Sequence, residues 1–420
     1  MEQIKILFCF LGVLFLGFNA HSQNDIYAVS EYPFIRNDLS RFIFPQDSSG
    51  YDSLFLKLNR LVKKGEGKIN IVHIGDSHIQ ADYFSGRMRE KLQSLYPGTL
   101  GARGFLFPSK LINSNNPFNF SLSYTGIWTG CKNVEFNKSC VLGLAGVTAY
   151  TVDTTASFLL RLRNKDCPKF DFNRIKVFHK MDASSYDVFL KNISVKEKFM
   201  ENDSTGFTQF LLQNYSDSLL LYVVKKDSSQ KSFTFYGLSL ENDDPGITYH
   251  SIGVNGAEVF SYLKCALLPY QLSTLKPDWV IVSLGTNDCY SAKWDTINFE
   301  KNLKLLIERI RLAKPGLPIL FTTPTDNFRR RRFRNPDVVI AARIILKVAS
   351  ENNCAVWNLF AVMGGFGSVV NWSLAGLTAN DKLHFSKAGY YLQGDLLFSA
   401  FLKAYDRFIE QTIEINGLDQ

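Results

Sequence analysis

The stretch INIVHIGDSH, residues 69–78, begins as an apolar run and ends in small and polar residues. Four later runs have the same form, at residues 247–252, 279–284, 319–323 and 355–360. Because these runs are apolar on both faces, they are typical of parallel strands buried between layers of helices. Ligands of such sheets bind at the carboxyl ends of the strands, so a site is expected where these runs end.

Amphipathic stretches separate most of these runs. Apolar residues recur at helical spacing in residues 84–96, 259–268, 299–313 and 338–351. A last helix is expected over about 387–409, with Ser386 as its N-cap. Strands that alternate with helices predict an α/β fold, with a doubly wound, flavodoxin-like sheet of five parallel strands.

Residues 105–244 show a different pattern. Short segments with period-2 alternation and many Phe, Tyr and Val are bounded there by Asn, Asp, Ser and Lys. The segments are 158–163, 174–179, 185–190, 208–212, 218–224 and 232–240. This spacing favours an all-β sandwich inserted into an α/β domain made of 23–104 and 245–420. An elaborated α/β loop is the alternative.

The N-terminus has the form of a secretory signal. Lys5 supplies positive charge, residues 6–18 are apolar, and Ala20 and Ser22 lie three and one residues before a cut ahead of Gln23. We therefore expect residues 1–22 to be removed and the protein to be secreted or periplasmic, with an uncleaved anchor as the alternative. No later segment is apolar enough to span a membrane, so no stable membrane insertion is expected after signal removal.

Composition excludes few classes of function. The 420 residues are 46% hydrophobic and 20% charged, as in an ordinary globular protein. The formal net charge of +8 would favour acidic surfaces or polyanionic glycans. The charges are too scattered to indicate nucleic acid as a partner.

The cysteines suggest structural roles. Cys131 and Cys140 bracket a short polar loop, and an exported protein could join them in a disulfide. Cys265 and Cys354 lie in apolar contexts typical of a core. No cysteine has metal-ligand spacing, so no metal site built on cysteines is expected.

Three separated residues could supply nucleophilic chemistry. Ser77 follows the first strand and precedes a helix expected from Ala81 onward; alone, Gly-Asp-Ser is also ordinary turn chemistry. His384 has a carboxylate three residues upstream, Asp381, which could fix its tautomer and leave the other ring nitrogen free to deprotonate Ser77. His78 adjoins Ser77, but successive side chains diverge, so it is poorly placed for this role. A loop Asp before a helix-start His is the simpler alternative.

Donors for a developing negative charge follow two other strands. Asn287, in Gly-Thr-Asn-Asp, could shape a turn or offer its amide as an oxyanion donor. Gly256, in Gly-Val-Asn-Gly, could let the backbone approach a substrate and offer an N–H. Gly253 is the alternative to Gly256.

With these blocks in order, the sequence resembles the SGNH (GDSL-like) hydrolase superfamily over roughly 65–105 and 245–410. The resemblance implies Ser77 as nucleophile, His384 and Asp381 as its partners, and Ser77, Gly256 and Asn287 as oxyanion donors. His78 in place of the usual Leu, and the long insert before the second block, resemble the branch of peptidoglycan O-acetylesterases. The family pattern needs no cofactor.

Side chains near the strand ends could bind substrate. Arg331 lies in a run of arginines, residues 329–334, that is either a solvated loop or a clamp for an anionic glycan or phosphate. Tyr290 and Trp294 could line a sugar cleft, although core packing is the alternative for each.

The expected activity is removal of O-acetyl groups from an acetylated polysaccharide, with peptidoglycan as the leading substrate. A lipase or lysophospholipase, an acetyltransferase with the same triad, and a glycan-binding protein with a vestigial site are the alternatives.

Overall fold

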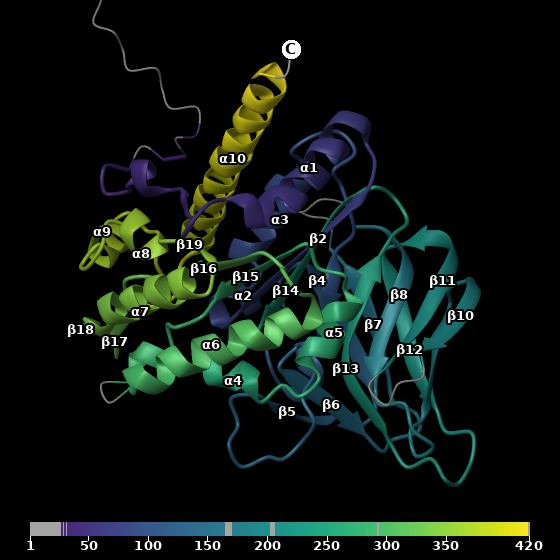
Figure 1. The fold of residues 1–420 in the computed structure, drawn as a ribbon. Coiled ribbons are helices and arrows are strands. Elements are labelled where there is room, and N and C mark those ends of the chain that lie inside the picture. The colour runs from purple at the N-terminus through teal and green to yellow at the C-terminus, as the bar shows by residue number, and fades with distance from the viewer. Residues whose placement is uncertain are drawn as a thin grey trace, which may run out of the picture.

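A six-stranded sheet organises the α/β part of the chain (Figure 1). The computed structural model describes residues 27–418 except 28, 31, 164–169, 202–205 and 292–293, so the expected signal peptide, residues 1–22, lies outside the described residues. In order across the sheet, the strands are β1 (Phe42–Ile43), β19 (Ala355–Trp357), β16 (Ile319–Thr322), β15 (Trp279–Ser283), β2 (Lys68–Gly75) and β14 (Gly246–Gly253).

The five predicted strands are present and parallel, but the sheet has a sixth strand. This edge strand, β1, pairs antiparallel with β19 and is only two residues long. The prediction of five strands was therefore one short, because two residues are too few to show alternation.

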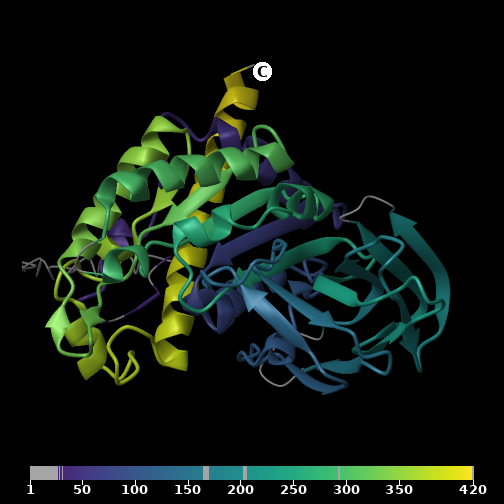
Figure 2. The ribbon, with the colours of Figure 1, turned by 90° about the horizontal axis from the view of Figure 1, so that it is seen from below.

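Helices cover both faces of this sheet (Figure 2). Ile71 of β2 faces a core with α1, α3 and α10, whereas Val72 faces the opposite core with α4 to α7. The helices are α1 (Asp52–Lys64), α2 (Ser77–Gln80), α3 (Phe84–Gln93), α4 (Val259–Leu263), α5 (Leu268–Thr274), α6 (Thr296–Ala313), α7 (Asp337–Glu351), α8 (Leu359–Val362), α9 (Val369–Leu374) and α10 (Lys387–Leu418).

Short 3-10 helices complete the helical elements: η1 (Asn37–Leu39), η2 (Ser49–Tyr51), η3 (Ser109–Ile112) and η4 (Asp288–Tyr290). At the start of α10, the hydroxyl of Ser386 accepts a hydrogen bond from the Gly389 N–H at 3.2 Å, which is the expected N-cap. Within the described ranges, no helix combines the length and apolarity that a membrane crossing requires.

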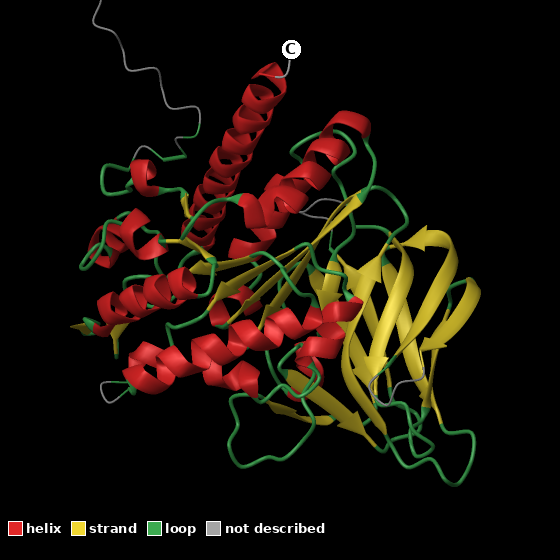
Figure 3. Cartoon of the chain, in the orientation of Figure 1, coloured by secondary structure: helices red, strands yellow, loops and turns green. Residues whose placement is uncertain are grey.

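Between Gly104 and Glu241 the chain forms antiparallel sheets (Figure 3). One sheet has the order β10-β11-β8-β13-β6-β5, with β3 beside β13, and the other has the order β4-β7-β12-β9. The strands are β3 (Gly104–Leu106), β4 (Phe120–Thr125), β5 (Thr129–Lys132), β6 (Val147–Thr151), β7 (Ser157–Leu162), β8 (Phe172–His179), β9 (Asp187–Lys191), β10 (Val195–Glu201), β11 (Phe207–Ser216), β12 (Ser218–Val224) and β13 (Phe233–Glu241). We call residues 104–241 the β region.

The two sheets of the β region share one core. The rings of Phe158 (β7) and Phe235 (β13), one from each sheet, pack with their centroids 5.6 Å apart. The disulfide between Cys131 and Cys140 is present and closes the loop after β5. Elsewhere in the described chain, β17 (Phe328–Arg329) and β18 (Phe333–Arg334) form a small hairpin.

A buried ion network joins the β region to the α/β part. Asp82, in the turn between α2 and α3, accepts hydrogen bonds from Arg89 at 3.0 and 3.1 Å and from Arg103 at 2.7 Å. Asn119, at the edge of β4, also donates to it. Burial alone would raise the pKa of Asp82, but the two guanidinium groups hold it well below its usual range. Both cations therefore depend on one buried carboxylate.

We predict that Asp82→Ala strongly destabilises the fold. Removal of one member of a buried ion network leaves the others charged and unpaired, which costs roughly 3–5 kcal/mol of unfolding free energy. Urea unfolding followed by circular dichroism measures this loss. The matched control is Asp38→Ala, because the Arg36–Asp38 pair is exposed and its loss leaves the midpoint nearly unchanged. An Asp82→Ala midpoint equal to that of the wild type would contradict the prediction.

Candidate active site

The carboxyl ends of three neighbouring strands stop at one level. Gly75, the last residue of β2, is in register with Gly253 of β14 on one side and with Ser283 of β15 on the other. The segments that follow these strands therefore begin at the same edge of the sheet. They carry Ser77, Gly256 and Asn287.

A chain of hydrogen bonds links Ser77 to two residues more than 300 positions away. The hydroxyl of Ser77 lies 3.0 Å from Nε2 of His384, and Nδ1 of His384 lies 2.8 Å from Oδ2 of Asp381. The other oxygen of Asp381 accepts from the backbone N–H groups of Leu383 and His384, at 3.0 and 2.9 Å. The structure therefore brings the predicted serine, histidine and aspartate together in a linear relay.

The carboxylate of this relay stays ionised. Partial burial would raise the pKa of Asp381, but the hydrogen bonds from the His384 side chain and from the two backbone N–H groups lower it to about 2. An ionised Asp381 stabilises the tautomer of His384 that carries its proton on Nδ1. Nε2 is then free to accept the proton of Ser77.

The turn that carries Ser77 differs from the prediction. The helix was expected from Ala81 onward, but a short helix, α2, already begins at Ser77. The reason is Asp76, which acts as the N-cap and accepts from the His78 N–H at 3.0 Å. Because the first N–H groups of a helix have no partner within it, the Ser77 N–H is available to a ligand.

Gly256 and Asn287 face the same pocket as Ser77. The amide nitrogen of Asn287 donates to the carbonyl of Ala257 at 3.0 Å and makes a longer contact, 3.3 Å, with Asp76. Of the two candidate glycines, Gly256 lines the pocket in a left-handed conformation with φ of 80°. Gly253 instead packs against the backbone of α2, where a Cβ would lie 2.3 Å from the Gln80 nitrogen.

The pocket around these residues has a volume of about 630 Å³. Its described lining residues are Ser77, His78, Gln80, Ala81, Tyr83, Asn115, Asn116, Asn255, Gly256, Thr286, Asn287, Leu383, His384, Phe385 and Tyr390. Asn115 and Asn116 come from the β region, so both parts of the chain form the pocket. The structure thus surrounds the serine with amides, a hydroxyl and aromatic rings.

Gln80 connects the two parts at the pocket wall. Its side-chain oxygen accepts from the backbone N–H of Asn255 at 2.7 Å, on the turn that carries Gly256. Its side-chain nitrogen donates to the Asn115 carbonyl at 2.9 Å and to the Ser114 hydroxyl at 3.2 Å. One buried amide therefore holds a loop of the β region against the glycine turn.

His78 points away from the Ser77 hydroxyl, as expected. Its Nδ1 lies 2.9 Å from the hydroxyl of Tyr390, and its ring centroid lies 5.3 Å from that of His384. Burial lowers the pKa of His78 to about 3, so this ring is neutral at physiological pH. It therefore fills the space beside His384 without competing for positive charge.

Three predicted substrate-binding residues, Arg331, Tyr290 and Trp294, are not among the described residues that line this pocket. Arg331 is exposed at the turn between β17 and β18, as in the solvated-loop alternative. The hydroxyl of Tyr290 accepts from the Arg330 N–H at 2.9 Å and so braces that hairpin. Trp294 packs edge-on against Phe299 of α6. Their role in substrate binding therefore stays a prediction, and they do not line the pocket around Ser77, because strand ends fix backbone positions and not side-chain directions.

Other lining residues were not predicted. Asn115 and Asn116 lie in the polar stretch 113–117, which indicates a turn but not that the turn returns to Ser77. Tyr83 and Tyr390 are separated by more than 300 residues, yet their rings stack with centroids 6.3 Å apart. No spacing in the sequence could have paired them.

Two further carboxyl groups lie behind the pocket: Asp76 is buried, and Asp288 is partly buried. Burial raises the pKa of Asp288 to about 8 and that of Asp76 to about 7, from an ordinary value of 3.8. Asp288 accepts from the Val259 N–H at the start of α4, at 3.1 and 3.3 Å. Asn287 donates to the Ala257 carbonyl and Asp288 accepts from the Val259 N–H. These two adjacent residues therefore fix the backbone on both sides of Glu258.

Comparisons with known proteins concern the family and the fold. Residues 216–392 match the GDSL-like Lipase/Acylhydrolase family, which confirms the expected resemblance; the match includes Asn287, Asp381 and His384 and begins after Ser77. No curated protein matches the chain.

Among solved structures, a peptidoglycan O-acetylesterase is similar over 87% of this chain and 99% of its own, with a TM-score of 0.73 and 21% identity. A lipase/acylhydrolase from Enterococcus faecalis is 24% identical, with a TM-score of 0.32 over 39% of this chain and 77% of its own. An acetylxylan esterase from Geobacillus stearothermophilus is 20% identical, with a TM-score of 0.31 over 39% of this chain and 74% of its own. The first of these shows that the chain has the SGNH hydrolase fold.

We predict that stability falls as pH rises because of Asp76 and Asp288. A group whose pKa is higher in the folded state favours folding while it is protonated. This contribution is complete below about pH 4 and is lost as pH rises through 7 to 8, by up to about 1.4 kcal/mol per pH unit for each group. Urea unfolding between pH 5 and pH 9 measures the decline, which we expect to be shallower in Asp288→Asn. Equal slopes for the variant and the wild type would contradict the assignment.

Proposed function

We propose that the protein is a secreted or periplasmic serine esterase that removes O-acetyl groups from a polysaccharide, with peptidoglycan as the leading substrate. The observation that carries the proposal is the relay from Asp381 through His384 to Ser77, which opens into a pocket beside Gly256 and Asn287. The signal-like residues 1–22 support export. The fold shared with a peptidoglycan O-acetylesterase supports the substrate class.

In the first step, Ser77 attacks the acetyl carbonyl. Nε2 of His384 takes the hydroxyl proton as the Oγ–carbon bond forms, and Asp381 stabilises the imidazolium. The negative charge that develops on the carbonyl oxygen is received by the Ser77 and Gly256 N–H groups and by the Asn287 amide. The Asn287 hydrogen now directed at Asp76 over 3.3 Å is the weaker of its two contacts and is the one exchanged for the oxyanion.

The second half of the cycle repeats this chemistry with water. His384 returns its proton to the departing sugar oxygen, which leaves an acetyl group on Ser77. Water then enters, His384 removes its proton, and the tetrahedral species collapses to acetate and free Ser77. Neutral His78, beside His384, adds no charge that would oppose the imidazolium.

The β region takes part in substrate binding in this proposal. We interpret residues 105–244 as a β-sandwich module inserted between 23–104 and 245–420. Asn115 and Asn116 bring amide groups from this module into the pocket, where they can bond sugar hydroxyl or acetamide groups.

We predict that Ser77→Ala and His384→Ala each lower kcat for acetate release by at least about a thousandfold, because each removes a member of the relay. Acetate release from O-acetylated peptidoglycan and from acetylated xylan measures the loss and ranks the two substrates. Ser94→Ala is the matched control, since this exposed serine at the end of α3 bonds only to helix carbonyls among the described contacts. Undiminished release by a folded Ser77→Ala protein would remove the mechanism.

We predict that Asn287→Ala lowers kcat by about a hundred- to a thousandfold with a smaller change in KM, because the amide acts mainly on the transition state. Steady-state kinetics on a short acetyl ester separates the two parameters. A rise in KM at unchanged kcat would instead assign Asn287 to ground-state binding.

Chain-length preference tests the alternative of a lipase or lysophospholipase. We expect kcat/KM to fall from acetyl to octanoyl esters, because the pocket of about 630 Å³ is lined by amides and histidines as well as aromatic rings. Hydrolysis of a series of p-nitrophenyl esters measures this preference. A value that rises with acyl length would favour the lipase.

A further inference from the structure

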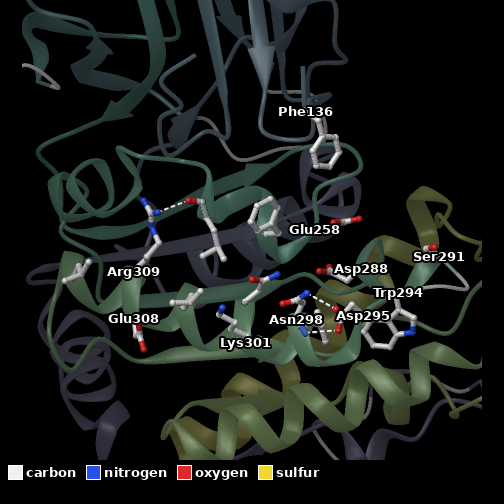
Figure 4. Close-up of a pocket in the computed structure, with 16 residues that line it drawn as sticks. Phe136, Glu258, Asp288, Ser291, Trp294, Asp295, Asn298, Lys301, Glu308 and Arg309 are labelled. Atoms are coloured by element: carbon white, nitrogen blue, oxygen red, sulfur yellow. Dashed lines mark hydrogen bonds between the residues drawn. The ribbon is translucent and has the colours of Figure 1, made fainter. Parts of the chain in front are cut away.

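A second hollow, of about 760 Å³, is lined by residues close in sequence to those of the catalytic pocket, and Figure 4 shows the side chains that line it. Phe136, on the loop between β5 and β6, faces it from the β region, whereas Lys301, Glu308 and Arg309 of α6 face it from the opposite side. We call this surface the side groove. Its other described lining residues are Glu258, Phe260, Leu263, Asp288, Ser291, Trp294, Asp295, Asn298, Phe299, Asn302, Leu305 and Leu312.

The side groove and the catalytic pocket share a wall. Gly256 lines the catalytic pocket and Glu258, two residues later, lines the side groove. In the same way, Asn287 lines the catalytic pocket and its neighbour Asp288 lines the side groove. Val134, two residues before Phe136, lies 4.0 Å from the position of a Cβ on Gly256. The two hollows therefore adjoin at the glycine turn, which is where a long ligand seated at Ser77 would pass from one to the other.

The groove presents aromatic rings to solvent. Phe136 is 81% exposed and Phe260 is 43% exposed. Exposed aromatic rings gathered at a concave surface between two parts of a protein are typical of a binding site. Trp294, which the sequence indicated as a residue that could line a sugar cleft, lines this groove.

The Phe136 loop is held in place. The disulfide between Cys131 and Cys140 closes the loop, and the Glu135 carboxylate accepts from the Lys132 N–H at 3.0 Å. The ammonium group of Lys264 lies 4.7 Å from the centroid of the Phe136 ring, within the range of a cation–π contact. The ring is therefore presented in a defined position, which lowers the cost of binding.

The charges around the groove nearly cancel, because the ammonium group of Lys264 also lies over the rings of Phe136 and Phe260. Glu258, Asp295 and Glu308 supply carboxylates, against the cations Lys301 and Arg309. Arg309 is already bound to the carbonyls of Leu263 and Cys265, at 2.7 and 2.6 Å. Although the whole chain is basic, a surface with balanced charges favours an uncharged ligand over a polyanion. Neutral sugar rings have an apolar face that can stack on Phe136 and Phe260, and polar edges that can bond to Asn298 and Asn302.

We propose that the side groove binds uncharged sugar residues of the glycan chain next to the acetylated residue at Ser77. This inference rests on the proposed function, since it names the part of the polymer that the esterase grips outside its catalytic pocket. In this proposal Phe136, which belongs to the β region, helps the enzyme to select the polymer as its substrate.

Binding of an oligosaccharide that carries no O-acetyl ester tests the groove without any ester cleavage. We expect the mature protein to bind the tetramer of N-acetylglucosamine in calorimetry, and Phe136→Ala to weaken binding at least tenfold. The matched control is Phe199→Ala, a 51% exposed phenylalanine on β10, which should bind as the wild type does. No binding by the wild type, equal binding by Phe136→Ala, or an equal loss in Phe199→Ala would overturn the proposal.

Kinetics separates failure of the groove from failure of the esterase. We expect Phe136→Ala to lower the ratio of kcat/KM on acetylated polymer to kcat/KM on a short acetyl ester about tenfold, because only the polymer reaches the groove. An unchanged ratio would overturn the groove while leaving the esterase intact. No ester hydrolysis by the wild type would remove the proposed esterase, and full hydrolysis by Ser77→Ala would remove its serine mechanism. In either case the oligosaccharide result would still decide whether the groove binds sugars.

Discussion

The parallel register of β14, β2 and β15 is the constraint on which the candidate site depends. Gly253, Gly75 and Ser283 end these strands at one level, so the next few residues of each segment emerge side by side. This arrangement places Ser77, Gly256 and Asn287 around one pocket without any long loop to position them. His384 then needs only the start of α10, which packs against α3, to complete the relay.

The β region is built into the site and is not a detachable attachment. Asp82 binds Arg103 and Asn119 in a fully buried network, and Gln80 bonds the loop at Asn115 to the turn at Asn255. Asp82 and Gln80, which make these contacts, both lie within five residues of Ser77. A change in the β region would therefore reach the serine turn through buried polar contacts, which are costly to leave unpaired.

The sequence predicted the elements whose signals are local. The strand at 69–74, its successors and most helices follow from apolar periodicity, and the Gly-Asp-Ser and Asp-x-x-His segments carry their own chemistry. Helix α1 was missed although Leu54, Leu58 and Leu61 have helical spacing and are buried. The start of α2 was also misplaced, because the cap at Asp76 depends on the observed backbone of one turn.

What the sequence could not show are contacts between distant segments. The pairing of His78 with Tyr390, the return of Asn115 to the pocket and the placement of Phe136 opposite α6 join residues that are far apart in the chain. For Arg331, Tyr290 and Trp294 the sequence indicated the correct edge of the sheet but not the direction of the side chains. Trp294 illustrates the difference, because it lines the side groove and not the pocket around Ser77.

The central step of the proposed reaction is transfer of the acetyl group from the substrate to the Ser77 oxygen. Acid quenching of the wild-type protein during turnover of an acetyl ester, followed by peptide mass spectrometry, tests this claim most directly. The account predicts one added acetyl group, on the peptide that contains Ser77. An acetyl group found on another residue during turnover would contradict acetyl transfer to Ser77. So would an unmodified Ser77 in a protein whose product release shows a burst.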